Sequence, residues 1–138
     1  MNKIYVLDAC AVIAALSNED GADKVEVAYK EVASGNAKII VNIVNLLEVY
    51  YDDYRVHGKK SADKMVESIM ASPTIIVSEI NKDIFKEAGR LKATYKISLA
   101  DAFVLAQTKV VGGVLLTSDH HEFDIVEANE SIKFLWIR

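Results

Sequence analysis

With 138 residues, 51% of them hydrophobic and only one a proline, the chain fits one compact domain around a single core, which we expect to span residues 1–138. Its formal net charge of −4 at pH 7 argues against a surface that coats nucleic acid non-specifically, and no apolar run reaches the roughly 18 residues that a membrane span needs. The single cysteine, Cys10, rules out an internal disulfide, so we expect a reducing, cytoplasmic setting.

Short β-rich runs alternate with longer helical segments along the chain. Five runs are typical of strands because they are short and rich in β-branched residues: 3–7, 38–42, 74–78, 113–117 and 132–137. Seven segments have the length and punctuation of helices: 9–16, 21–34, 43–57, 60–71, 81–95, 98–110 and 120–128. The first four strands are apolar almost throughout, as strands covered on both faces are. The alternation predicts an α/β fold, a three-layer α/β/α sandwich with a mostly parallel central sheet of four or five strands.

Acidic residues follow two of these strands directly, at the edge where ligands bind in such a sheet. Asp8 comes after the first strand in "YVLDACAVIAAL", and Asp119 follows the fourth strand in "LLTSD". Asp101 occurs in "SLAD", where Ser98 is the expected cap of a helix that is apolar all round and should be buried. All three acids also fit helix capping, so none of them is decisive alone.

Glu48 lies within the helical segment "IVNLLEVYYDDY". The spacing of four apolar or aromatic residues predicts the buried face of this helix: Ile43, Leu47, Tyr50 and Tyr54. Glu48 borders that face, and with Asp52 it forms an acidic i,i+4 pair that costs a few tenths of a kcal/mol. A solvated helix flank therefore explains Glu48 as well as a functional site does.

Four acidic side chains would repel one another strongly if they met at this edge of the sheet: Asp8, Glu48, Asp101 and Asp119. At about 6 Å and an effective dielectric constant of about 20, each pair costs roughly 3 kcal/mol and the whole set up to roughly 15 kcal/mol. Because that rivals the stability of a domain, protons or cations would have to neutralise the charges. Hard oxygen ligands favour Mg²⁺ or Mn²⁺, which can activate water and stabilise a phosphodiester in transit. The pattern indicates nuclease chemistry.

The same stretches resemble the motifs of PIN-domain ribonucleases, in particular the VapC-type toxins of toxin–antitoxin pairs, over essentially the whole chain. The marks are, in order, "YVLDACAVIAAL", "NLLEVYY", "ISLADAFVLAQ" and "LLTSDHHEFD". The resemblance implies a Mg²⁺- or Mn²⁺-dependent endoribonuclease that hydrolyses RNA phosphodiester bonds, usually as a homodimer. It implies that the catalytic, metal-binding residues are Asp8, Glu48, Asp101 and Asp119. It also implies an antitoxin partner that offers an apolar helix and an Arg to the acidic pocket.

The resemblance suggests supporting residues as well. Thr117 is similar to the hydroxyl residue that forms hydrogen bonds within the family's pocket, and Asp124 is an additional acid for which a solvated helix flank is the alternative. Many relatives have Thr or Ser directly after the first Asp, where this chain has Ala9, so we expect hydroxyl support of Asp8 from Thr117 or Ser118. Cys10 is interpreted as a packed small residue and not as a nucleophile, because no His lies beside it in the sequence.

Basic and aromatic residues near the acids are candidates for RNA contacts, although an ordinary charged helix face explains the basic ones equally well. The basic candidates are Arg55, Lys59, Lys60, Lys82, Lys86, Arg90, Lys92 and Lys96. Tyr50, Tyr51 and Tyr54 have rings that can stack bases, but Tyr50 and Tyr54 fit the core or a dimer interface better. His120 and His121 are interpreted as surface residues at a helix start.

Three other classes of protein share part of this pattern of acidic residues in an α/β fold. A phosphotransferase of the haloacid-dehalogenase type needs a second Asp two positions after the first, where Cys10 stands. A receiver-type signalling domain uses paired acids after its first strand and a phosphoacceptor Asp after its third, but here Ala9 follows Asp8 and the third strand leads into "SEIN". A catalytically silent PIN fold, serving as an RNA-binding or assembly module, stays open as the alternative, while the presence of all four acids favours activity.

Overall fold

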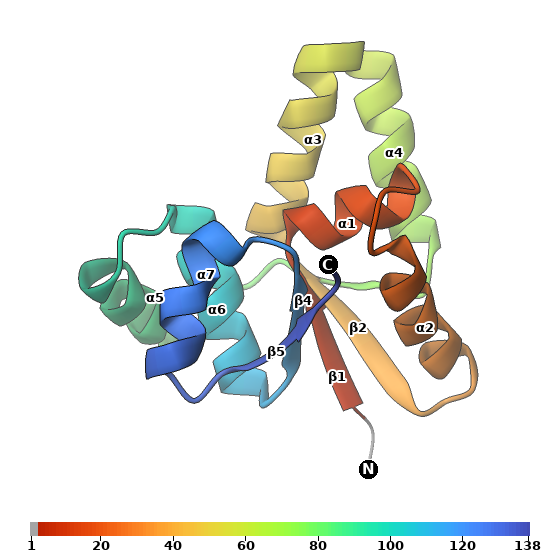
Figure 1. The fold of residues 1–138 in the computed structure, drawn as a ribbon. Coiled ribbons are helices and arrows are strands. Elements are labelled where there is room, and N and C mark those ends of the chain that lie inside the picture. Colours follow the sequence, from red (N-terminus) through yellow and green to blue (C-terminus); the bar gives the residue numbers. More distant parts are fainter. Residues whose placement is uncertain (1–2) are drawn as a thin grey trace.

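The computed structural model of the chain describes residues 3–138 and shows a parallel sheet between two layers of helices (Figure 1). The five strands are β1 (Lys3–Leu7), β2 (Ala37–Asn42), β3 (Ile75–Val77), β4 (Val114–Thr117) and β5 (Lys133–Trp136). Their order is β3-β2-β1-β4-β5, and each neighbouring pair is parallel. Within these described residues the helices are α1 (Ala9–Leu16), α2 (Ala22–Ala33), α3 (Ile43–His57), α4 (Lys59–Ala71), α5 (Lys82–Thr94), α6 (Leu99–Val111) and α7 (His120–Asn129).

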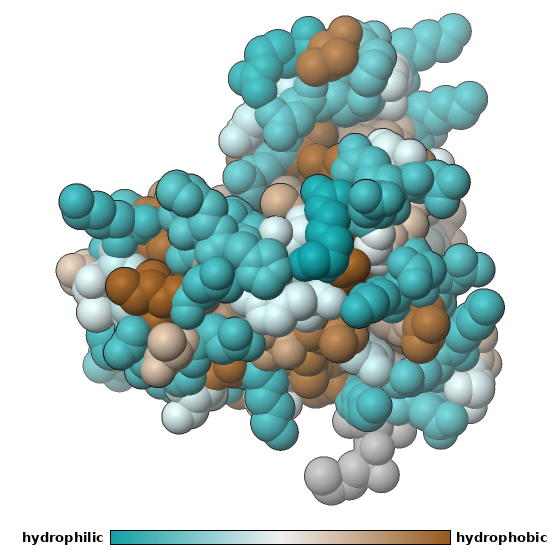
Figure 2. Space-filling model, in the orientation of Figure 1, coloured by the Kyte–Doolittle hydropathy of each residue, from teal (hydrophilic) through white to brown (hydrophobic). Residues whose placement is uncertain are grey.

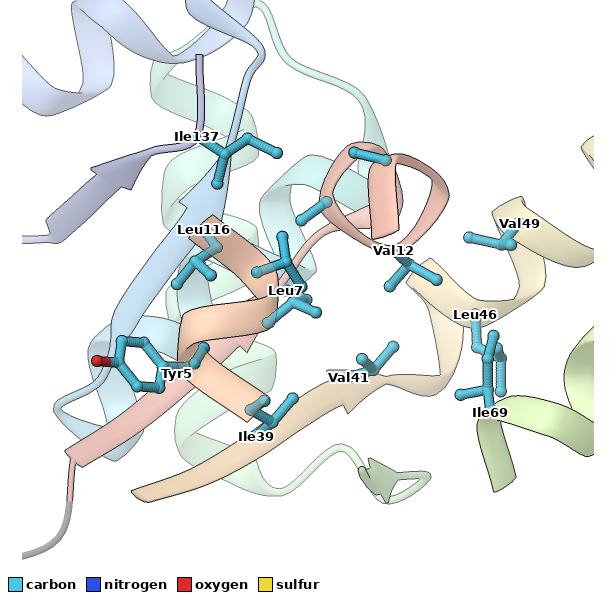
Figure 3. Close-up of a cluster of buried hydrophobic side chains, with 14 of the residues drawn as sticks. Tyr5, Leu7, Val12, Ile39, Val41, Leu46, Val49, Ile69, Leu116 and Ile137 are labelled. Atoms are coloured by element: carbon cyan, nitrogen blue, oxygen red, sulfur yellow. The ribbon is translucent and has the colours of Figure 1, made fainter. Parts of the chain in front are cut away.

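The two faces of the sheet pack into separate hydrophobic clusters, because successive side chains of a strand point to opposite faces. In β1, Tyr5 and Leu7 join a cluster with α1, α2 and the first half of α3, which Figure 3 shows in close-up. Val6, between them, packs into a second cluster with α5, α6 and α7. Burial on both sides explains why these strands are apolar almost throughout. It also confirms the three-layer α/β/α prediction, with five strands.

The element boundaries confirm the predictions from the sequence. Every predicted strand and helix is present, and each predicted end lies within one residue of the observed one. The helix predicted over 98–110 is α6, and it is buried along most of its length, as its apolar composition indicates. Among the described residues, no helix combines the length and the apolar character needed to cross a bilayer.

One prediction about α3 is wrong. Leu47 and Tyr54 were expected on its buried face, but 55% and 46% of their surface is exposed. The buried residues of α3 are Asn45, Leu46 and Val49, which are offset from that face. The reason lies in the α3–α4 hairpin, which projects beyond the end of the sheet (Figure 1). The apolar face of α3 therefore turns toward α4, where it lines an open apolar groove with residues such as Val66 and Met70.

The surface seen in Figure 2 is mostly hydrophilic, with separate hydrophobic patches, one of them at the tip of the α3–α4 hairpin. The exposed large hydrophobic side chains include Val56, Phe85 and Ile125, which lie on α3, α5 and α7. Scattered exposure of this kind is normal for a globular protein and by itself assigns no function.

Candidate active site at the carboxyl end of the sheet

Asp8 stands at the carboxyl end of β1, the central strand, where the chain turns into α1. Its side chain is buried, with only 4% of the residue exposed. One carboxylate oxygen, Oδ1, accepts a hydrogen bond of 2.9 Å from the backbone N–H of Ala11 and so caps α1. The other, Oδ2, accepts one of 2.5 Å from the hydroxyl of Thr117. Because both oxygens are held, the carboxylate has a fixed orientation.

Thr117 reaches Asp8 because of the strand register. Leu7 of β1 pairs with Leu116 of β4, so the next residue of each strand lies beside the other at the point where the connections leave the sheet in opposite directions. The Thr117 hydroxyl also accepts a 3.1 Å hydrogen bond from the backbone N–H of Asp119. The hydroxyl support expected for Asp8 therefore comes from Thr117, whereas the Ser118 hydroxyl interacts with Cys10.

Replacing Thr117 with Val removes this hydroxyl and keeps the shape of the side chain. We expect the variant to lose about 1–3 kcal/mol in free energy of unfolding, because the buried Asp8 carboxylate loses a donor and the Asp119 N–H loses an acceptor. Urea unfolding at pH 8 measures the loss. Thr108→Val is the matched control, since that buried hydroxyl only donates to the Val104 carbonyl within α6. Equal losses of stability in the two variants would contradict the role of Thr117 in holding both Asp8 and the Asp119 backbone.

Asp101 and Asp119 come to the same edge of the sheet on the N-termini of α6 and α7. The backbone N–H of Asp101 donates to the hydroxyl of its N-cap residue, Ser98, at 3.0 Å. Asp119 is itself the N-cap of α7, where its Oδ1 accepts a 3.1 Å hydrogen bond from the N–H of Glu122. The capping interpretation is therefore correct for these acids and for Asp8. Capping does not exclude a functional role, because the N-termini of three helices bring their acids to one edge.

The charges of neighbouring acids act on the pKa values of Asp8 and Asp101. Burial raises the pKa of Asp8 to about 7, against the hydrogen bonds from Thr117 and Ala11, and the charges of Asp101 and Asp119 raise it further. Burial also raises the pKa of Asp101 to about 6, to which Asp119 adds by repulsion. Such mutual effects require short separations, because charge interactions fall off with distance.

Glu48 joins this group from α3, on the side of Asp101. Its charge raises the pKa of Asp101, while burial raises its own pKa. The Asn45 amide, one turn earlier, donates a 3.4 Å hydrogen bond to its Oε1. Asp8, Asp101 and Asp119 are thus electrostatic neighbours, and Glu48 is a neighbour of Asp101. We call them the acidic cluster: Asp8, Glu48, Asp101 and Asp119.

Two further residues at the cluster were missed in the sequence. Glu122, in the first turn of α7, contributes to the raised pKa of Asp101. Asn45 is 1% exposed, and its Oδ1 is a buried acceptor with no hydrogen-bond partner. The available signals were their spacings, three residues after Asp119 and three before Glu48. Asp124 is exposed: 64% of its side chain is accessible and its carboxylate contacts the His120 ring at 2.8 Å.

Cys10 is half-buried beside the cluster. Burial raises the pKa of its thiol to about 12, and the charges of Asp8, Asp119 and Asp101 add to the effect, while Ser118 opposes it. A thiol with so high a pKa is protonated at neutral pH and is a poor nucleophile. This agrees with the interpretation of Cys10 as a packed small residue.

The donor chemistry of the acidic cluster fits a divalent cation. It offers carboxylate oxygens, the Asn45 carbonyl oxygen without a partner, and no nitrogen or thiolate ligand, a set that suits Mg²⁺ or Mn²⁺. A cation would also relieve the repulsion that raises the pKa values of Asp8 and Asp101. Within residues 3–138, no three His, Cys, Asp or Glu side chains form a group that could hold a metal ion between them.

Some of the basic and aromatic candidates for RNA contacts form salt bridges or ring contacts with other residues of the chain. Arg55 pairs with Asp52, Lys59 with Asp63, and Arg90 with Glu87 and Glu130. The exposed pairs of Arg55 and Lys59 are worth at most about 1 kcal/mol, so a phosphate can compete for these two side chains. Arg90 is held more firmly, because the side chains of Glu87 and Glu130 are only 18% and 9% exposed. The rings of Tyr50 and Tyr54 pack edge to face, with 5.8 Å between their centroids. The exposure of Tyr54 contradicts a place in the core.

The comparisons with known proteins agree with the fold. The family model of the PIN domain matches residues 5–129 of the sequence. A search of curated proteins by sequence gave no match.

Three solved structures illustrate the similarity in fold. VapBC2 of Rickettsia felis, bound to a DNA fragment from its promoter, is 15% identical, with 96% of this chain and 98% of that chain covered and a TM-score of 0.75. DNA-bound VapBC of Salmonella typhimurium is 15% identical over the full length of both chains, with a TM-score of 0.73. VapC20 of Mycobacterium tuberculosis, described as a sarcin–ricin loop cleaving toxin, is 15% identical, with 80% of this chain and 86% of that chain covered and a TM-score of 0.60.

Proposed function

Because this chain belongs to the PIN-domain family, we propose that it is a Mg²⁺- or Mn²⁺-dependent endoribonuclease, a hydrolase of RNA phosphodiester bonds that uses the acidic cluster as its active site. The observation that carries the proposal is a buried carboxylate, Asp8, with partly buried and mutually repelling acids beside it at the carboxyl end of a parallel sheet. That is where α/β sheets bind ligands, and it is a poor place for acids without a function, because their burial costs stability.

Asp8, Glu48, Asp101 and Asp119 would hold the metal, with Asp8 and Asp101 as the strongest candidates for direct contact. Once bound, such an ion activates a water molecule and neutralises charge on the phosphate. The chain's own residues prepare the site. Thr117 fixes the Asp8 carboxylate, and Ser98 fixes Asp101. The N-termini of α1, α6 and α7 add partial positive charge, which favours the ionised carboxylates and an incoming phosphate.

We also propose that the protein is the toxin of a VapBC-type toxin–antitoxin pair and forms a homodimer. Support comes from structures of similar fold that are described as VapBC bound to DNA or as a toxin–antitoxin complex. An acidic cluster that lacks a cation would attract an Arg side chain of an antitoxin, since a charged pair at this buried edge neutralises the repulsion. Co-purification with the product of a short neighbouring gene, followed by light scattering, would test both parts.

The enzymatic proposal is tested by incubating the purified protein with a pool of structured and unstructured RNAs. We expect cleavage with Mg²⁺ or Mn²⁺, none with EDTA, and recovery when the ion is added back in excess. Asp101→Asn should be inactive under all of these conditions, because it removes a charge from the acidic cluster. RNAs that stay intact with both ions would overturn the nuclease proposal. RNAs that bind without being cut would identify the RNA-binding or assembly module instead.

A further inference from the structure

Aromatic side chains of β5 and α7 form a column that runs from the core to the surface. Phe134 and Trp136 are two residues apart on β5 and so project from the same face, with 5.4 Å between ring centroids and 9° between ring planes. The imidazole of His120 stacks on Trp136 at 3.8 Å and 15°. Phe123, which is fully buried, packs against Phe134 at the inner end. We call Phe134, Trp136 and His120 the aromatic column.

The outer residues of the aromatic column adjoin residues of the acidic cluster or of its support, along the backbone and across the sheet. His120 directly follows Asp119, so their Cα atoms are about 3.8 Å apart. Trp136 pairs with Thr117 in the register of β4 and β5, and the Thr117 hydroxyl holds Asp8. His120 is therefore the sequence neighbour of one residue of the proposed active site, and Trp136 is the strand neighbour of another residue that supports it.

The exposed part of His120 is a face of its ring. Its Nδ1 contacts Asp124 Oδ1 at 2.8 Å and its Nε2 contacts the backbone oxygen of Arg138 at 2.9 Å, so both nitrogens are occupied. One face lies against Trp136, yet 49% of the side chain is exposed. The part of the ring that solvent can reach is the face opposite Trp136, together with the ring carbon atoms at its edge. Because three contacts hold the ring, this surface is rigid and needs little ordering when a ligand binds.

We propose that the open face of His120 is a stacking site for an unpaired base of a single-stranded nucleic acid, which extends the aromatic column by one ring next to the scissile phosphate. This deepens the proposed function, because it rests on RNA as the substrate. Every base has a π-face, so the contact would tolerate different sequences. A base within a duplex has both faces stacked, so the site selects unpaired positions. Lys24, whose Nζ lies 3.4 Å from the backbone oxygen of Trp136, provides one positive charge for the phosphates, against the carboxylates of Glu127 and Asp124 that contact Trp136 and His120.

The chain contains a single tryptophan, and it belongs to the column, so its fluorescence reports on this site alone. The test uses the full-length Asp101→Asn variant with Mg²⁺ and a short single-stranded oligoadenylate, which that variant should not cut. We expect saturable quenching of the Trp136 emission. His120→Ala should weaken binding by roughly tenfold, as the loss of one stacked base predicts. A labelled oligonucleotide followed by anisotropy gives the affinity independently of the quenching.

His121→Ala is the matched control, because this neighbouring histidine is also exposed on the first turn of α7 but is not part of the column. We expect its affinity to stay within about twofold of the parent. His120→Phe restores a flat ring and should restore binding, which keeps the test informative if His120→Ala is unstable. Equal affinities for the Ala variants at positions 120 and 121, or full binding by anisotropy without any change in Trp136 emission, would overturn the inference.

The binding test of the His120 stacking site and the cleavage test of the proposed function can fail independently. If the wild-type protein cleaves RNA while the His120 variants bind as the parent does, the nuclease proposal stands and the stacking site is wrong. If the oligonucleotide binds through His120 but the wild-type protein cuts no RNA with either ion, the stacking site stands and the nuclease proposal is wrong.

Discussion

Asp8→Asn is expected to lower RNA cleavage by at least about a thousandfold, the loss of roughly 4 kcal/mol of transition-state stabilisation. Of the four acids, Asp8 is the most buried, and both of its oxygens are fixed by neighbouring groups. An amide is nearly isosteric but carries no charge, so it is a much weaker ligand for a hard cation. The fold should survive, because Asn is also a good helix N-cap and can accept the hydrogen bond from Ala11.

The same variant should be more stable than the wild-type protein when no metal is present. Burial raises the pKa of Asp8 to about 7, so above that pH the folded state carries a carboxylate that it disfavours. Removing the charge should raise the free energy of unfolding at pH 8 by about 2–4 kcal/mol. Any loss of the hydrogen bond from Thr117 reduces this gain. A gain in stability together with a loss of activity is typical of a residue kept for function.

Cleavage rates and urea unfolding in EDTA measure the two effects. Asp23→Asn is the matched control, because Asp23 is an exposed acid in the first turn of α2, and we expect it to change neither quantity appreciably. An unchanged cleavage rate in Asp8→Asn would show that the active site has been assigned to the wrong residues. A variant that is inactive but also unfolded would contradict the expected stability.

Most of the fold could be predicted because its signals are local. The apolar strands and the capping residues Asp8, Ser98 and Asp119 mark element ends within a few residues of sequence, and the structure confirms them. The buried face of α3 could not be predicted in the same way. Periodicity shows that a helix has an apolar face, but it does not show whether that face meets the sheet or, as with Leu47, opens onto a groove beside α4.

The candidate site was predictable only in part, for a related reason. Asp8 and Asp119 follow strands, so the topology of a parallel sheet is enough to bring them together. Glu122 is different, because a carboxylate in the first turn of a helix is explained by the helix dipole, and its influence on Asp101 depends on how α7 lies against α6. For Asn45, the spacing of three residues from Glu48 places both on one side of a helix, but that the Asn45 oxygen lacks a partner is a property of tertiary packing.

Without metal, the free energy of unfolding should fall as the pH rises from about 4 to about 7. The ordinary pKa of an Asp side chain is 3.8, whereas that of the folded Asp8 is about 7. Between these values the folded state keeps a proton that the unfolded state has released, so raising the pH favours unfolding. The shift corresponds to about 4 kcal/mol for Asp8, and Asp101, with a folded pKa of about 6, changes stability in the same direction. Asp8→Asn should flatten most of this dependence.

Mg²⁺ or Mn²⁺ should reverse that loss, because the ion binds the ionised acids of the folded state. At a hundred times its dissociation constant, a ligand adds about 2.7 kcal/mol to stability, which for a chain of this size raises Tm by about 10 °C. We expect the gain at pH 8 to exceed the gain at pH 5, since at pH 5 protons compete for Asp8 and Asp101. Thermal unfolding with each ion, against KCl of equal ionic strength, measures it. If Tm at pH 8 is the same with and without the ions while Asp8→Asn still stabilises, the cluster repels charge without binding metal, and the protein is the silent module.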